Sequence, residues 1–123
     1  LEYEKEPTPL PTDDPYTLEE FRTDVRNILN VNTNQEAFDN TITISTIWNN
    51  HHALVTPLEL YFKSLGYYTG EVEQLVGKRP DFGKGMKSAT MLYQKNVVKP
   101  AKAKDVDGVI TRMKATWKKL LLG

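Results

Sequence analysis

The chain has 123 residues and a mass of 14.1 kDa, which is enough for one ordinary domain or two very small ones. It contains no cysteine, which excludes disulfides, thiolate nucleophiles and cysteine-based zinc sites, and it has no apolar run near the ~20 residues that a membrane helix needs. Net charge is zero, but residues 1–53 carry 3 Lys/Arg against 10 Asp/Glu, and residues 54–123 carry 13 against 6. The basic C-terminal half fits solvated helix faces and also fits a surface that meets an anionic polymer.

Residues 1–15 are rich in proline and acidic residues, a composition that buries little apolar surface and favours an extended chain. We therefore expect an acidic, proline-rich linker over 1–15. A linker of this kind implies a further domain on its other side, and a first residue that is not Met agrees with a fragment of a longer protein.

Ordered structure is predicted to begin at Tyr16, because Thr17-Leu18-Glu19-Glu20 fits a capping box ahead of an amphipathic helix over 18–29. Asn34 is expected to cap one short turn that runs through Phe38. The alternating, β-branched run 41–45 fits either a short strand or an extended crossing segment, and a single strand would need a partner.

Thr56-Pro57-Leu58-Glu59 repeats the capping-box pattern, and Gly66 stands where a left-handed cap would end the helix that follows. Further helices are predicted from about 85 to 96 and from about 113 to 122. Asp107-Gly108 marks a turn between them. The prediction is a small all-α domain of three to five helices, with at most a short strand around 41–45.

Five short motifs follow one another along the C-terminal half: Leu65-Gly66-Tyr67, Phe82-Gly83, Tyr93-Gln94-Lys95, Val106-Asp107-Gly108 and Thr116-Trp117-Lys118-Lys119-Leu120. In this order and spacing they resemble the three-helix peptidoglycan-binding domain found at the ends of bacterial and phage cell-wall hydrolases. The resemblance implies a helical bundle of the peptidoglycan-binding type over residues 51–123. This is the kind of domain found at the C-terminus of clostridial-type endolysins and N-acetylmuramoyl-L-alanine amidases.

Residues 16–50 resemble a degenerate first half-repeat of the same unit, which would give one and a half to two repeats in all. The second copy departs from the family pattern between Glu71 and Gly83, where an insert of about seven residues leaves the alignment register ambiguous. The family's proline and capping threonine are replaced by Lys84 and Met86. We expect Asp81 to take over as the helix cap.

The residues offer weak support for catalysis. His51 and His52 are adjacent and point in different directions on a regular backbone, so one capping or stacking histidine and one solvated histidine are expected. They lack zinc-ligand spacing, so no metal site is predicted. The carboxylate pairs Glu71 with Glu73 and Asp105 with Asp107 fall in turns of a domain too small to enclose a sugar chain. Neither a complete calcium loop nor a complete phosphate loop is present, and no cofactor is expected.

The helix exit near Tyr67 and the helix entrance near Lys84 are predicted to form a shallow groove. Aromatic faces stack on sugars, and basic groups and backbone N–H donors suit the carboxylates of wall peptides. We expect the ligand here, on Tyr67, Tyr68, Thr69, Asp81, Gly83 and Lys84, with Lys87 on the rim. Phe82, Tyr93 and Trp117 are expected in the core, as is one of Tyr67 and Tyr68. Trp48 either seals the two copies together or forms an exposed platform.

The resemblance implies a non-catalytic domain that tethers a lysin or amidase to peptidoglycan or an associated wall polymer, outside the cell. Its partners would be that polymer and an N-terminal catalytic domain of the same polypeptide, with no nucleic acid and no membrane. The alternative is a protein-interaction or dimerisation module of a cell-wall enzyme. A basic nucleic-acid-binding domain is disfavoured because no helix combines a dense Arg/Lys face with base-reading Asn or Gln.

Overall fold

The computed structural model describes residues 15–123, and these residues form a small all-α fold, as predicted. Its five α-helices are α1 (Leu18–Leu29), α2 (Asn34–Asp39), α3 (Val55–Ser64), α4 (Lys84–Tyr93) and α5 (Ala115–Leu122). Single turns η1 (Glu73–Val76), η2 (Gln94–Val98) and η3 (Ala103–Asp105) lie between them. The predicted linker lies outside the described residues except for Pro15.

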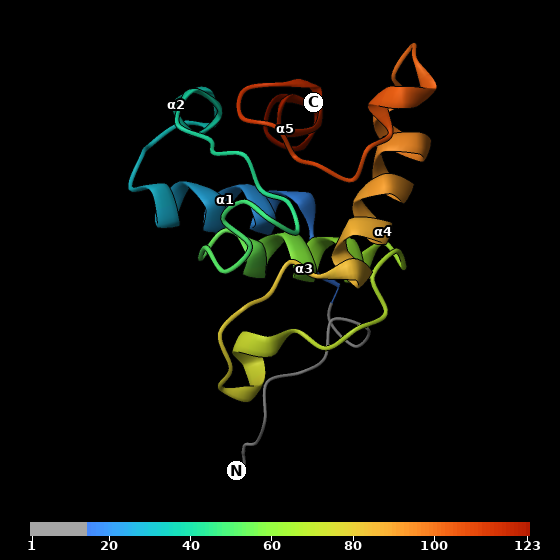
Figure 1. The fold of residues 1–123 in the computed structure, drawn as a ribbon. Helices are drawn as coiled ribbons and strands as arrows, with labels where there is room; N and C mark the ends of the chain where they lie inside the picture. Colours follow the sequence, from blue (N-terminus) through green and yellow to red (C-terminus); the bar gives the residue numbers. More distant parts are fainter. Residues whose placement is uncertain (1–14) are drawn as a thin grey trace.

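The elements are arranged with α2 and α5 side by side over the pair formed by α1 and α3 (Figure 1). Helix α4 starts beside α3 and rises along one side of the molecule, so that its end reaches the level of α5 (Figure 1). The connection from α3 to α4, which contains η1, extends on the opposite side from α2 and α5. No helix in the described part of the chain is long and apolar enough to cross a membrane.

The first helix forms as the sequence predicts. Thr17 Oγ1 accepts a hydrogen bond from Glu20 N at 3.1 Å, and Thr17 N donates to Glu20 Oε1 at 2.9 Å, which completes the capping box. The prediction for α2 is wrong at its start, since Thr33 rather than Asn34 caps it. Thr33 Oγ1 accepts from Glu36 N at 3.0 Å, and Asn34 is already helical.

The second predicted capping box, at Thr56, is also wrong. Helix α3 begins two residues earlier, with Leu54 instead of Thr56 at the N-cap and no side-chain cap. Glu59 cannot reach back to cap the helix because it lies on the buried face of α3, and the Thr56 hydroxyl donates to Gln74 instead. The C-terminal end follows the prediction: Gly66 has φ +82°, and Tyr67 N donates to Phe62 O at 2.9 Å.

Residues 41–45 are extended and form a single antiparallel bridge rather than a strand. Ile44 N donates to Ile110 O and Ile110 N to Ile44 O, both at 2.9 Å. Trp117 Nε1 donates to Ile42 O at 2.8 Å. The segment therefore ties the N-terminal third of the chain to the loop before α5 and to α5 itself.

The last two helices start or end differently from the prediction. Helix α4 begins at Lys84 with Gly83 as N-cap and no side-chain cap, so the expected cap by Asp81 is wrong. Its end widens into the π-helical turn η2 and stops at Lys99, whose φ is +54°. Helix α5 begins only at Ala115, because Met113 has φ +56° and cannot be part of a right-handed helix.

One hydrophobic core joins residues from both halves of the chain, including Phe21 and Val25 of α1, Phe62 of α3, Tyr93 of α4 and Trp117 of α5. Phe82, Tyr93 and Trp117 are buried as predicted. The division into a half-repeat over 16–50 and a full repeat over 51–123 stays a prediction.

Candidate functional site

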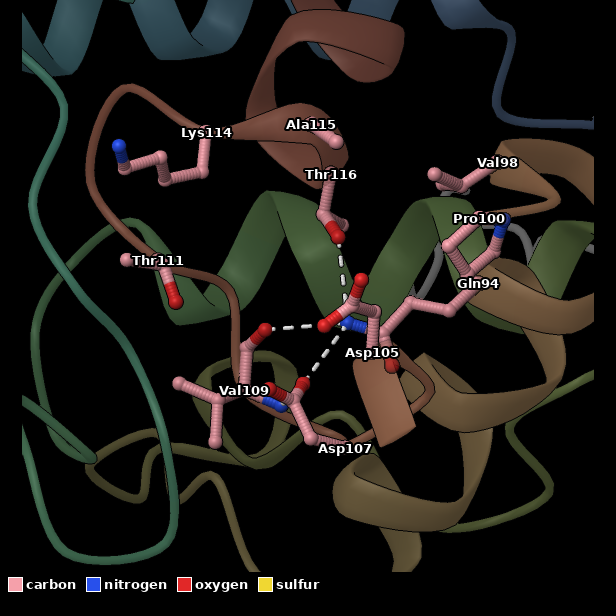
Figure 2. Close-up of a pocket in the computed structure, with 10 residues that line it drawn as sticks. All are labelled: Gln94, Val98, Pro100, Asp105, Asp107, Val109, Thr111, Lys114, Ala115 and Thr116. Carbon is pink, nitrogen blue, oxygen red and sulfur yellow. Dashed lines mark hydrogen bonds between the residues drawn. The ribbon is translucent and has the colours of Figure 1, made fainter. Parts of the chain in front are cut away.

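The end of α4, the turn around Asp107 and the start of α5 enclose a cavity of about 310 Å³ (Figure 2). This is the size range of small-ligand pockets in proteins. Its lining combines polar, charged and small apolar side chains: Gln94, Val98, Pro100, Asp105, Asp107, Val109, Thr111, Lys114, Ala115 and Thr116.

A buried glutamine holds the wall of this cavity together. Gln94 is 2% exposed, and its Nε2 donates to Asp107 Oδ1 at 3.2 Å, Val109 O at 3.0 Å and Thr116 Oγ1 at 3.1 Å (Figure 2). Its Oε1 accepts from Gly108 N at 2.9 Å. Fully satisfied buried polar groups of this kind make a wall rigid.

The Gln94 network brings together three of the motifs noted in the sequence. Gln94 comes from Tyr93-Gln94-Lys95, Asp107 from Val106-Asp107-Gly108 and Thr116 from the motif that opens α5. Asp107 Oδ1 also accepts from Val109 N at 3.0 Å, which closes the turn around Gly108. The polar residues of these motifs therefore shape the cavity by bonding to one another.

The loop that leads into α5 is held from the other side by the extended segment 41–45. Arg112 N donates to Thr43 Oγ1 at 3.0 Å, and Met113 N donates to Thr41 Oγ1 at 2.9 Å. These bonds fix the left-handed Met113 and so set the position of Lys114 on the cavity rim. Helix α5 opens on the cavity without a side-chain cap, so its first N–H groups have no side-chain acceptor from the N-cap residue.

Charged side chains of both signs line the cavity. Lys114 and Thr111 lie on one side, with the Lys114 side chain extending away from the other lining residues, whereas Asp105 and Asp107 lie nearer to Gln94 (Figure 2). Within residues 15–123, neither the Asp105 carboxylate nor the Lys114 ammonium has an ion-pair or hydrogen-bond partner. Neither group is therefore committed to another residue within 15–123, whereas Asp107 is committed to the turn.

The residues predicted to contact the ligand lie elsewhere, and none of the seven lines this cavity. Tyr68 is 7% exposed and its phenol donates to Glu71 O at 2.8 Å, while its ring packs against Gly85 near the start of α4. The structure thus brings the exit of α3 and the entrance of α4 together, as predicted, but the Tyr68 ring fills the space between them. Tyr67 is half-buried, and Thr69 is exposed.

The remaining predicted residues are spread along α4. Gly83 caps the helix, Lys84 is exposed at its first position, and Asp81 lies 3.6 Å from His51 Nδ1. Lys87 is exposed one turn further and packs against Gly108, on the outer side of the turn that borders the cavity. Because α4 is about 15 Å long, the predicted groove and the cavity are at opposite ends of one helix.

The two histidines take separate roles. His51 Nδ1 lies 2.8 Å from Pro80 O, whereas His52 Nδ1 accepts from Leu54 N at 3.0 Å just ahead of α3. Burial lowers the pKa of His52. No group of three or more His, Cys, Asp or Glu side chains within residues 15–123 is arranged to hold a metal ion.

Two features escaped the sequence analysis. Asp105 and Lys114 were not singled out as ligand contacts, although each lies two residues from a motif residue of the Gln94 network. Glu59 was assigned to a cap, but it is 0% exposed and neither carboxylate oxygen has a hydrogen-bond partner among the described residues. Burial, with a further contribution from the nearby Glu73 carboxylate, raises the pKa of Glu59 to about 9.

Comparisons of the chain with models of protein families, with curated proteins and with solved structures found no match.

Proposed function

We propose that this chain is a non-catalytic domain that holds a peptidoglycan hydrolase, a lysin or amidase, on the bacterial cell wall. The observation that carries the proposal is the convergence of three motif residues on one cavity. Gln94, Asp107 and Thr116 come from three separate pieces of the family resemblance, and they meet in one hydrogen-bond network at its wall. A cavity bordered by this network is a reasonable place for the wall ligand.

The mechanism is tethering rather than chemistry. A domain that holds its enzyme on an insoluble polymer raises the local concentration of cleavable bonds, and so increases the rate without a new catalytic group. The partners are peptidoglycan or an associated wall polymer and a catalytic domain on the same polypeptide. The site of action is the cell wall, outside the cell.

Co-sedimentation with purified sacculi tests the proposal. The full chain is mixed with sacculi before and after acid removes the secondary polymers, and with an insoluble polysaccharide of unrelated structure as the control. We expect retention on both sacculus preparations and none on the control. Retention lost on acid treatment would move the ligand to a teichoic-type polymer, and no retention on either preparation would contradict the proposal.

A dimerisation or protein-interaction module is the alternative, and one surface feature favours it. Ile47 and Trp48 are 74% and 56% exposed at the tip of a tight turn that Ser45 closes, since Ser45 Oγ accepts from both of their backbone N–H groups. Trp48 therefore does not seal the two halves together. A molar mass that rises with concentration, and that Trp48→Ser returns to that of a monomer, would support this alternative.

A further inference from the structure

We propose that the Gln94 cavity binds the peptide stem of peptidoglycan and not its glycan strand, with Lys114 taking a carboxylate of the stem and Asp105 its free ammonium group. This inference rests on the proposed function and names the part of the polymer that is recognised. It moves the ligand from the predicted groove to the other end of α4.

The lining of the cavity argues against a sugar. Sugar-binding sites commonly present an aromatic face on which the C–H surface of a pyranose ring stacks. None of the ten lining residues is aromatic. The aromatic residues nearest in sequence, Tyr93 and Trp117, are buried in the core, where Tyr93 packs against Phe62 and Trp117 Nε1 bonds to Ile42 O.

The charges of the cavity match a peptide stem. A stem ends in a D-alanine carboxylate and carries a diamino residue with a free ammonium, so it presents opposite charges a few residues apart. Asp105 lies beside Gln94 and Lys114 lies at the rim of the cavity (Figure 2), and neither has a partner in the described part of the chain. A ligand that carries both charges can pair with both the Lys114 ammonium and the Asp105 carboxylate, whereas a neutral glycan can pair with neither.

The apolar part of the lining has the right scale for alanine. Val98, Pro100, Val109 and Ala115 present short aliphatic surfaces in the cavity. They suit a methyl side chain better than a ring. The Gln94 network and the two threonine bonds to the 111–113 loop hold these surfaces in place before a ligand arrives, which limits the ordering that binding requires.

The test uses soluble stem tetrapeptides, N-acetyl-L-Ala-γ-D-Glu-L-Lys-D-Ala and its counterpart with meso-diaminopimelate at the third position. Each is titrated into the full chain by NMR. We expect at least one to shift amide signals of residues 94–117 and to bind about tenfold more weakly to Asp105→Asn and to Lys114→Gln. The matched controls Asp39→Asn and Lys118→Gln change exposed residues outside the cavity and should bind like the parent chain.

Modified peptides identify which charge meets which residue. Acetylation of the side-chain amine should weaken binding to the parent but cause little further loss in Asp105→Asn. Amidation of the C-terminal carboxylate should likewise weaken binding to the parent but cause little further loss in Lys114→Gln. Such non-additive losses are expected only when the two altered groups contact each other. Purely additive losses in both pairs would overturn the assignment of the two contacts.

Two wall preparations separate this inference from the proposed function. Glycan strands freed of their stems by an amidase and immobilised on beads should not retain the chain, whereas intact sacculi should. Retention on stem-free glycan, or parent-like peptide binding by both cavity variants, would overturn the stem assignment and leave wall binding in place. Failure to bind either preparation would remove both proposals.

Discussion

The buried carboxyl group of Glu59 gives the structure a specific dependence of stability on pH. Its two oxygens have no hydrogen-bond partner in the described residues, and it faces the Glu73 carboxylate and the Tyr68 phenol, with Asp81 also close enough to act on it. Burial in these surroundings raises its pKa from 4.5 to about 9. There is therefore a pH range in which Glu59 is protonated in the folded protein but ionised in the unfolded chain.

The sign of the effect follows from proton binding. Between pH 4.5 and about 9 the folded state binds the extra proton, so the free energy of unfolding falls as the pH rises. The slope for one such group is about 1.4 kcal/mol per pH unit, which is roughly 2–3 kcal/mol between pH 6 and pH 8. Glu59→Gln has no proton to lose and removes this contribution while keeping nearly the same volume.

Urea denaturation followed by tryptophan fluorescence, in which the signal of buried Trp117 changes on unfolding, measures both proteins at pH 6 and pH 8. We expect Glu59→Gln to gain roughly 2–3 kcal/mol relative to the parent over this interval. The comparison cancels groups common to both proteins, including His52. Parallel stability curves, with a constant difference between parent and variant, would refute the interpretation of Glu59 as a neutral buried acid.

Three further predictions concern the turns and caps. Gln94→Leu should destabilise the fold by about 2–4 kcal/mol in urea denaturation, since it leaves Gly108 N without its acceptor, and wild-type stability would contradict the network. Gly66→Ala should lower the free energy of unfolding by about 1 kcal/mol, because of the left-handed φ alone. Gly108→Ala should lower it by more in the same assay, because the new Cβ would also lie 2.6 Å from Lys87 Cγ. Equal losses of stability in the two variants would refute this. Thr17→Ala should cost about 1 kcal/mol, with an unchanged melting temperature as the contrary result.

Local signals predicted the helices well where the deciding contacts are local. The capping box at Thr17 works because Glu20 is exposed and can turn back to the Thr17 backbone. The same pattern does not form a capping box at Thr56. Its last residue, Glu59, is buried against another part of the chain and cannot turn back to the Thr56 backbone. No sequence window around Thr56 contains that information, since burial of Glu59 depends on the 71–83 connection.

The candidate site was predicted less well because contacts distant in sequence build it. The motifs that carry Gln94 and Thr116 were identified, but their meeting point depends on how Thr41 and Thr43 hold a loop some 70 residues away. The predicted groove relied on helix ends that do come together. There the Tyr68 ring is buried between them; the sequence predicts that one of the two tyrosines is buried but does not reveal which one.

The most direct test of the account is a binding isotherm on intact sacculi for three proteins. These are the parent chain, the double variant Asp105→Asn/Lys114→Gln, and the control double variant Asp39→Asn/Lys118→Gln, each checked for an unchanged thermal unfolding curve. The account predicts that the parent and the control double variant bind alike and that the cavity double variant loses most of its retention. Equal retention of all three proteins would contradict the assignment of wall binding to this cavity.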